Sequence, residues 1–241
     1  MPRIAAMLRG KGGLLKRWVR WLGRALLLFV IGSTCLVSVY SLAPPPLTPL
    51  MVIRLFEGEG LSGHWRPLSE IDPNLVKAVI ASEDTTFCQH WGFDLDAIEA
   101  AWVRNQQGGR ILGGSTISMQ TAKNVFLWPD RTWVRKALEA WFTVLIEAGW
   151  SKSRIVETYL NVAEWGPGIY GADGAARYWF AADAGHLSRH QAALLAATLP
   201  APRRFRPDAP TPHLANRAAV IEMRMGALGP ENLPPCTPGE R

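Results

Sequence analysis

Acidic residues are absent from the first 24 positions of the chain. The same stretch carries seven of the 26 lysines and arginines, which leaves 19 basic against 20 acidic residues in the rest of the sequence. A nucleic-acid-binding protein spreads its basic charge over the folded domain, whereas here the excess is confined to one end. The charge distribution therefore argues against a nucleic-acid partner and marks residues 1–24 as a separate basic tail.

Charge of either sign is missing from the next 19 residues, Ala25–Ala43. A helix of that length measures about 28 Å, close to the hydrocarbon thickness of a bilayer. Because basic flanks stay in the cytoplasm, we expect a single-pass anchor in the cytoplasmic (inner) membrane, with the following domain in the periplasm. A cleaved signal peptide is the alternative. The long apolar run and the poor cleavage site at Pro44–Pro46 favour an uncleaved transmembrane helix.

Cysteine is scarce, with three in the whole chain. Cys35 lies in the predicted span, which leaves Cys88 and Cys236 in an oxidising compartment. Spacing alone does not decide between a disulfide and two free thiols, so both alternatives stay open.

Long alternating strand patterns and internal repeats are also missing, and Met51–Phe56 is the one candidate strand. Residues 44–50 are rich in proline and are expected to form a stiff stalk that lifts the domain off the membrane. Residues 51–241 carry capping residues ahead of apolar helical stripes, so we predict one predominantly α-helical domain. The expected helix starts are Asp72, Asp94, Ser115, Asp130 or Thr132, Ser151 and Ser188.

Two adjacent acids, Glu83 and Asp84, stand at the end of the helix predicted after Asp72. A helix C-terminus disfavours negative charge, and such departures from local preference are frequent at functional sites. A solvated surface pair is the ordinary alternative.

A glycine turn leads into a helix at Gly113–Asn124, GGSTISMQTAKN. Free backbone N–H groups and the positive end of the helix dipole suit an anionic group at such a turn. Lys123 lies two turns further along the same helix. An ordinary capped helix is the alternative.

Arg131, Arg135 and Glu139 are spaced four residues apart, so they share one face of a predicted helix. The three form either a salt-bridged surface stripe or a carboxylate held among cations that also bind a phosphate.

These segments, in this order, resemble the motifs of the peptidoglycan glycosyltransferase family, which includes the N-terminal domains of bifunctional penicillin-binding proteins. The matching residues are Glu83, Asp84, Phe87, His90 and Gly92 in the first motif, Gly113–Ile117, Gln120, Lys123 and Asn124 in the second, and Arg135, Lys136 and Glu139 in the third. Lys152–Asn161 and Gly168–Phe180 also fit. The chain lacks the Ser-x-x-Lys, Ser-Asp-Asn and Lys-Thr-Gly motifs of a transpeptidase, so it resembles the monofunctional members.

Two positions depart from the family pattern. Met119 stands where the family has a glutamine, and Trp179 where tyrosine is usual. We expect Met119 to remove one hydrogen-bonding side chain from the wall of the cleft.

The resemblance implies a lysozyme-like, all-α fold and the polymerisation of lipid II into β-1,4-linked glycan strands, with inversion and release of polyprenyl diphosphate. It implies that Glu83 is the general base for the incoming 4-hydroxyl, with a carboxyl that crowding by Asp84 makes harder to ionise. Glu139 would assist on the leaving side, and Lys123, Arg131 and Arg135 would clamp the diphosphate. The implied substrate-binding residues are Asp84, Ser115, Thr116, Gln120, Lys123, Asn124, Arg131 and Arg135.

No cofactor is required by this interpretation. A divalent cation, Mg or Mn, that bridges the phosphates stays open, although the sequence has no dedicated ligand cluster. The expected partners are lipid II, the growing glycan strand and the membrane, with division or cell-wall synthesis proteins as further candidates. Gly108–Leu112, with Trp102 nearby, is either a mobile lip that touches the membrane or a plain connecting loop.

Two other functions remain as alternatives. A lysozyme-like lytic enzyme would share the fold and the catalytic glutamate, but it needs no diphosphate clamp. A non-catalytic membrane scaffold of the cell-wall machinery would have no reason to retain both Glu83 and Glu139.

Overall fold

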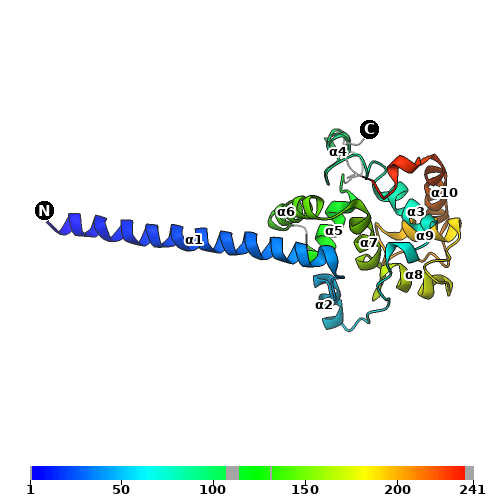
Figure 1. Ribbon diagram of the computed structural model, residues 1–241, viewed down its shortest axis with the longest axis horizontal. Coiled ribbons are helices and arrows are strands. Elements are labelled where there is room, and N and C mark those ends of the chain that lie inside the picture. The colour runs from blue at the N-terminus through cyan, green and yellow to red at the C-terminus, as the bar shows by residue number, and fades with distance from the viewer. Residues whose placement is uncertain (1, 107–113, 131, 237–241) are drawn as a thin grey trace.

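A long helix projects from a helical domain in the computed structural model, which describes residues 2–106, 114–130 and 132–236 (Figure 1). The long helix is α1 (Pro2–Leu42), and its segment Lys16–Leu42, of 27 residues, is long and apolar enough to cross a membrane. Arg131 and the predicted lip at Gly108–Leu112 lie outside the described residues.

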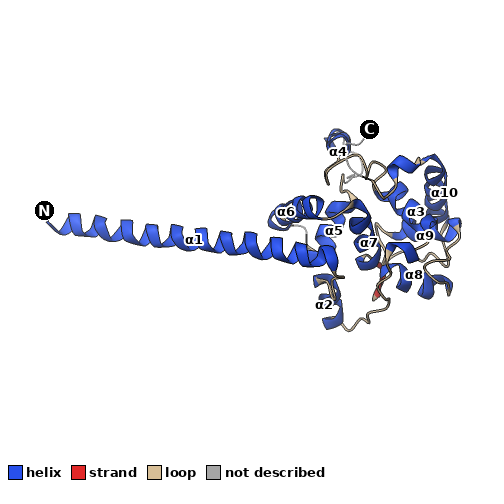
Figure 2. Ribbon diagram, in the orientation of Figure 1, coloured by secondary structure: helices blue, strands red, loops and turns tan. Residues whose placement is uncertain are grey.

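The domain is predominantly α-helical, as predicted, and its strands are confined to one short antiparallel pair in the described residues (Figure 2). The helices are α2 (Pro49–Phe56), α3 (Pro73–Glu83), α4 (Leu95–Gln106), α5 (Ile117–Phe126), α6 (Trp133–Gly149), α7 (Lys152–Val162), α8 (Gly171–Phe180), α9 (Arg189–Thr198) and α10 (Pro212–Ala227). The strands are β1 (Glu164–Gly166) and β2 (Ile169–Tyr170), and short 3-10 turns cover Leu68–Glu70 and Pro230–Asn232.

Most helices begin at the positions that the capping residues in the sequence predicted. A side-chain oxygen of the cap accepts a first-turn backbone N–H at Asp72, Asp94, Thr132, Ser151 and Ser188. These bonds satisfy donors that have no partner within the helix. The capping residues therefore set the boundaries of α3, α4, α6, α7 and α9.

Two local predictions were wrong. The cap of α5 is Thr116, whose Oγ1 accepts the N–H of Met119, rather than Ser115. Met51–Phe56 is helical rather than extended, because Thr48 caps α2 and a proline follows it at the first helical position.

The proline-rich segment 44–50 does not lift the domain away from the span, contrary to our expectation. The indole Nε1 of Trp141 donates to Ser33 Oγ at 3.1 Å, and that of Trp150 donates to the Val37 carbonyl at 2.9 Å. Arg154 adds bonds to the carbonyl of Tyr40 at the end of α1. Indole N–H groups need a partner when buried, and α1 supplies these acceptors. The domain therefore packs directly on its own anchor.

The core of the domain lies where α9 packs against α3 and α10, and where α5 packs against α6 and α7. Leu75, Ile80, Ile146, Ile155 and Leu195 are among its fully buried side chains. Small alanine side chains dominate α9, which allows the three helices to approach closely. The packing fixes the C-terminal end of α3 beside α5.

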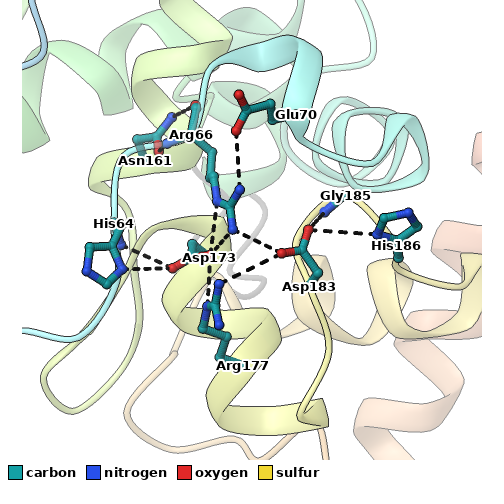
Figure 3. A network of polar contacts seen from close by, with 9 residues as sticks. All are labelled: His64, Arg66, Glu70, Asn161, Asp173, Arg177, Asp183, Gly185 and His186. Atoms are coloured by element: carbon teal, nitrogen blue, oxygen red, sulfur yellow. Dashed lines mark hydrogen bonds and ion pairs between the residues drawn. The ribbon is translucent and has the colours of Figure 1, made fainter.

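A buried aspartate holds the segment that leads into α3 (Figure 3). Asp173 of α8 is 0% exposed and accepts hydrogen bonds from Arg66 Nε and Nη2 at 3.1 and 3.0 Å, and from Arg177 Nε at 3.0 Å. Arg66 also donates to Asp183 at 2.9 Å, and its backbone is bonded on both sides by the Asn161 amide. The network therefore joins this segment to α7, to α8 and to the turn after α8.

Cys88 and Cys236 form a disulfide, which resolves the alternative that the sequence left open. The bond connects the loop after α3 to the C-terminal segment, and Gln89 donates to Asn232 at 2.7 Å beside it. Both cysteines lie outside the predicted span, and a disulfide of this kind is typical of an oxidising compartment.

We expect Asp173→Asn to lower the free energy of unfolding by about 3 kcal/mol at pH 7, because it leaves Arg66 short of its buried partner. Burial alone would raise the pKa of Asp173, but hydrogen bonds from Arg177, Arg66 and His64 outweigh it and hold the pKa below its ordinary value. The carboxylate therefore stabilises the fold above the unfolded pKa, about 3.9, and this stabilisation is lost as the pH falls through the folded pKa.

Urea unfolding in detergent at several pH values measures this difference, which should shrink below about pH 4. Asp208→Asn is the matched control, since Asp208 pairs with the exposed Arg206 and such pairs contribute about 1 kcal/mol or less. Equal free energies of unfolding for Asp173→Asn and the wild type at pH 7 would contradict the proposed contribution of the network to stability.

Candidate active site

Glu83 is the last residue of α3, and its side chain is 13% exposed. Its Oε1 accepts a hydrogen bond from Ser82 Oγ at 3.1 Å, and its Oε2 accepts one from Gln120 Nε2 of α5 at 3.0 Å. Tyr159 of α7 donates its hydroxyl to Gln120 Oε1 at 3.1 Å. Burial, and next the charge of Glu83, raise the pKa of Tyr159 well above its ordinary value. The tyrosine therefore remains a donor, and this fixes the direction of the amide.

Asp84, which the sequence analysis placed among the substrate contacts, is bonded within the protein. Its side chain is 2% exposed, with Oδ2 accepting the Ile117 N–H at 2.9 Å and Oδ1 in contact with His90 Nε2 at 2.9 Å. His90 Nδ1 accepts the Gly92 N–H, so Nε2 carries the proton that is donated to Asp84. The carboxylate joins the end of α3 to the first turn of α5, and a substrate contact of Asp84 stays a prediction.

The loop between α3 and α4 depends on Gly92. Its φ is +82°, and a Cβ there would lie 2.7 Å from Thr143 Cγ2 and 2.8 Å from Glu147 Cγ. Thr116 Oγ1 donates to the Gly92 carbonyl at 2.6 Å. Only glycine combines this backbone conformation with such a close approach to α6. The first and second sequence motifs are thereby fastened to one another.

A buried ion pair between Lys152 and Glu147 contacts the same loop. Lys152 Nζ donates to Glu147 Oε1 and to the His90 carbonyl, each at 2.8 Å, and Ser118 Oγ donates to the same glutamate oxygen. Burial lowers the pKa of Lys152, and the nearby Glu147 opposes the change. The sequence analysis missed Glu147, because nothing in its helical stripe distinguishes it from a surface acid.

A cavity of about 410 Å³ opens beside Gln120 and Tyr159. It is lined by Leu50, Arg54, Gln120, Lys123, Asn124, Leu127, Trp128, Pro129, Asp130, Arg135, Tyr159, Ala163, Glu164, Leu199, Pro200 and Pro202. Three of these residues, Arg54, Lys123 and Arg135, are cationic. The cavity therefore suits an anionic group close to the carboxylate of Glu83.

Lys123 is held in the wall of this cavity without a hydrogen bond or an ion pair to any residue in the described part of the chain. Burial lowers its pKa, and the charge of Glu139 opposes the change. Glu139 of α6 is buried and accepts from Arg135 Nη1 and Lys136 Nζ, both at 2.5 Å. Glu139 is thus placed to orient these two cations.

Arg54 lies on the opposite side of the cavity, on α2. Its Nε is 3.8 Å from Glu164 Oε1, to which Arg203 Nη1 donates at 3.0 Å. Arg203 also pairs with Glu59 at 2.5 Å. This network joins α2 to the segment after α9, and two of its members, Arg54 and Glu164, line the cavity. The sequence patterns gave no sign of it, since its members are up to 144 residues apart.

The other predicted residues divide between the cavity and the core. Asn124 lines the cavity, Ser115 is exposed, and Thr116 is buried as the cap of α5. Met119 is 4% exposed and is not part of the cavity wall, so the expected loss of a hydrogen bond at the wall was wrong. Arg131 lies outside the described residues, and its role stays a prediction.

No cluster of three histidine, cysteine, aspartate or glutamate side chains capable of holding a metal occurs among residues 2–106, 114–130 and 132–236. Asp130 and Glu164 are the acidic residues of the cavity wall. A divalent cation held by these residues together with a substrate diphosphate stays a prediction.

The family model described as "Transglycosylase" matches residues 51–226. A protein of Rhodospirillum centenum named "Biosynthetic peptidoglycan transglycosylase" is 55% identical over 215 residues, which cover 89% of this chain and 91% of that protein. Proteins of the same name are 50% identical in Caulobacter vibrioides (91% and 98% covered) and 52% identical in Pseudomonas putida (90% and 94% covered).

We predict that Asp84→Ala lowers the free energy of unfolding by about 2–4 kcal/mol, because it leaves His90 and the first turn of α5 without a buried acceptor. A residue that only touched substrate would leave stability unchanged within about 0.5 kcal/mol. Unfolding of the purified protein in detergent distinguishes the two roles, with the exposed Asp96→Ala as control. An Asp84→Ala protein of wild-type stability that fails only in substrate binding would restore the original prediction.

Proposed function

The chain belongs to the transglycosylase family, and we propose that it polymerises lipid II into β-1,4-linked glycan strands, with Glu83 as the general base. Family membership supports the broader statement that it is a peptidoglycan glycosyltransferase. The finer assignments of substrate, base and leaving-group contacts rest on the geometry of the cavity.

One observation carries the mechanism: α5 connects the carboxylate to the cations. Gln120 holds Glu83, and Lys123 follows three residues later in the cavity wall beside Arg135. Three residues of helix advance about 4.5 Å, so the amide that bonds the base and a cation suited to the diphosphate lie within one turn of each other on α5. In an inverting displacement the acceptor oxygen and the diphosphate oxygen lie on opposite faces of one anomeric carbon, so the base and the cations must act within a few ångströms of that carbon.

The reaction then follows from these positions. Glu83 takes the proton of the 4-hydroxyl of the acceptor sugar while the oxygen of that hydroxyl attacks the anomeric carbon of the donor. The new C–O bond forms as the bond to the diphosphate oxygen breaks on the opposite face, which inverts the configuration and gives a β linkage. Lys123 and Arg135 offset the negative charge that develops on the polyprenyl diphosphate. Glu139 keeps Arg135 and Lys136 oriented for that task.

A divalent cation, when bound, would add charge neutralisation at the diphosphate. The described side chains form no three-ligand cluster for it, so the substrate's own phosphate oxygens would supply most of its ligands. The steps above depend on the protein cations alone.

The anchor keeps the cavity close to the substrate's lipid tail. Ser33, which bonds Trp141, lies nine residues before the end of the apolar segment at Leu42, a distance of about 14 Å along the helix. α6 also exposes Trp133 and Val134. Exposed tryptophan and aliphatic side chains suit the membrane–water interface. The catalytic domain therefore rests on the outer surface of the inner membrane, in the periplasm, where division or cell-wall synthesis proteins are candidate partners.

Glu83→Gln should reduce lipid II polymerisation by at least about 100-fold, since general-base catalysis contributes about 10²–10⁴-fold. The change removes the proton acceptor but keeps the size of the side chain, so the unfolding midpoint should stay near that of the wild type. Turnover of labelled lipid II, followed by gel separation of the strands, measures the effect. Polymerisation within a few-fold of the wild type would remove Glu83 from its role as base.

The orientation has a separate test. A reporter that is active only in the cytoplasm should be silent when fused after Arg241. Seven basic residues precede the span and keep the N-terminus in the cytoplasm, so the C-terminus is expected outside. The same reporter fused after Arg24, before the span, should be active. Activity of the C-terminal fusion would contradict the periplasmic location.

A further inference from the structure

Arg217 of α10 approaches the carboxylate of Glu83 from the side away from α5. Its Nη2 donates to Ser82 Oγ at 3.3 Å and lies 3.8 Å from Glu83 Oε1. Ser82 Oγ donates in turn to the same Oε1 at 3.1 Å. The buried Nε of Arg217 has no hydrogen-bond partner among the residues that the structure describes. The guanidinium is thus oriented towards Glu83 without being saturated by another acid.

The packing of α10 explains this placement. Leu214, Ala218 and Ile221 are buried and hold α10 against α3 and α9. Arg217 lies between these residues in sequence and extends to the C-terminal end of α3. Free carbonyls and two acids concentrate negative charge there, and a cation stabilises such a helix end.

We propose that Arg217 is a positioning residue for the general base, holding the Glu83 carboxylate through Ser82 and favouring its ionised form. The inference rests on the proposed function, in which the ionised Glu83 accepts the proton of the sugar hydroxyl. Arg217 itself is not part of the cavity wall and acts on the reaction through Ser82 and Glu83.

The other groups around Glu83 cannot replace this charge. Gln120 of α5 donates as a neutral amide, and Tyr159 of α7 reaches Glu83 only through that amide. Lys123 of α5 also interacts electrostatically with Glu83, but Glu139 acts on Lys123 more strongly. Asp84, next in the chain, is an acid and adds negative charge, and its carboxylate already accepts hydrogen bonds from Ile117 and His90. Arg217 is therefore the cation whose charge is least shared with other acids.

Loss of this charge should make Glu83 easier to protonate. The acid limb of the pH–rate profile for polymerisation should then move to higher pH. An opposite charge at 4–6 Å typically changes a carboxyl titration by about 1–3 units. The Arg217 side chain is 37% exposed, and solvent weakens the interaction, so we expect a displacement of about one unit.

The experiment compares Arg217→Gln, which keeps a donor for Ser82 but loses the charge, with Arg217→Lys, which keeps the charge. Arg224→Gln is the matched control, because Arg224 is exposed on the same helix. Polymerisation of labelled lipid II is measured from about pH 5 to 9, and unfolding in detergent is followed in parallel. Arg217→Met, which keeps the aliphatic stem, serves as a second neutral variant if the glutamine protein does not fold.

Arg217→Gln or Arg217→Met should displace the acid limb upwards by about one unit. Arg217→Lys and Arg224→Gln should leave the limb within about 0.3 units of the wild type, with Arg217→Lys slower at every pH because it loses the planar fork. A neutral variant that folds and shows an undisplaced limb overturns the inference, even if its rate is low, since that pattern indicates packing alone. Wild-type protein that does not polymerise lipid II would instead contradict the proposed function.

Discussion

The structure of the site depends on one buried carboxylate between two helix ends of opposite polarity. Asp84 closes the C-terminal end of α3 and accepts the first N–H of α5, where the helix dipole favours negative charge. His90 and Gly92 hold the intervening loop around it. This junction brings Glu83, one residue before Asp84, against Gln120. Without it, the carboxylate of Glu83 and the cations of the cavity would belong to separate parts of the fold.

The two glutamates near this junction, Glu83 and Glu139, have different partners. Glu83 accepts its hydrogen bonds from two neutral groups, the Ser82 hydroxyl and the Gln120 amide. Glu139, in contrast, is held between Arg135 and Lys136 and is committed to orienting them. Lys123 stands near both acids without an ion pair to either in the described residues. Two glutamates of one site thus differ in role because of their partners, as in other enzymes that use pairs of carboxyl groups.

Local signals in the sequence predicted much of this arrangement, and long-range contacts account for what they missed. Capping residues predicted α3, α6, α7 and α9, since a cap acts within one turn. The burial of Asp84 depends on α5, 33 residues away, and the approach of Arg217 depends on packing across 135 residues. The stalk was misread for the same reason, because Trp141 and Trp150 fasten the domain to α1 through contacts over 100 residues apart.

The central claim is that the cavity builds glycan strands from a diphosphate-linked donor rather than cleaving finished ones. Detergent-solubilised protein should be incubated with labelled lipid II, and separately with mature peptidoglycan. The account predicts long labelled strands that lysozyme digests to small fragments, and no soluble release from mature peptidoglycan, whose interior bonds carry no phosphate for the cations to bind. Release of fragments from mature peptidoglycan, with lipid II left unused, would contradict it and establish the lytic alternative.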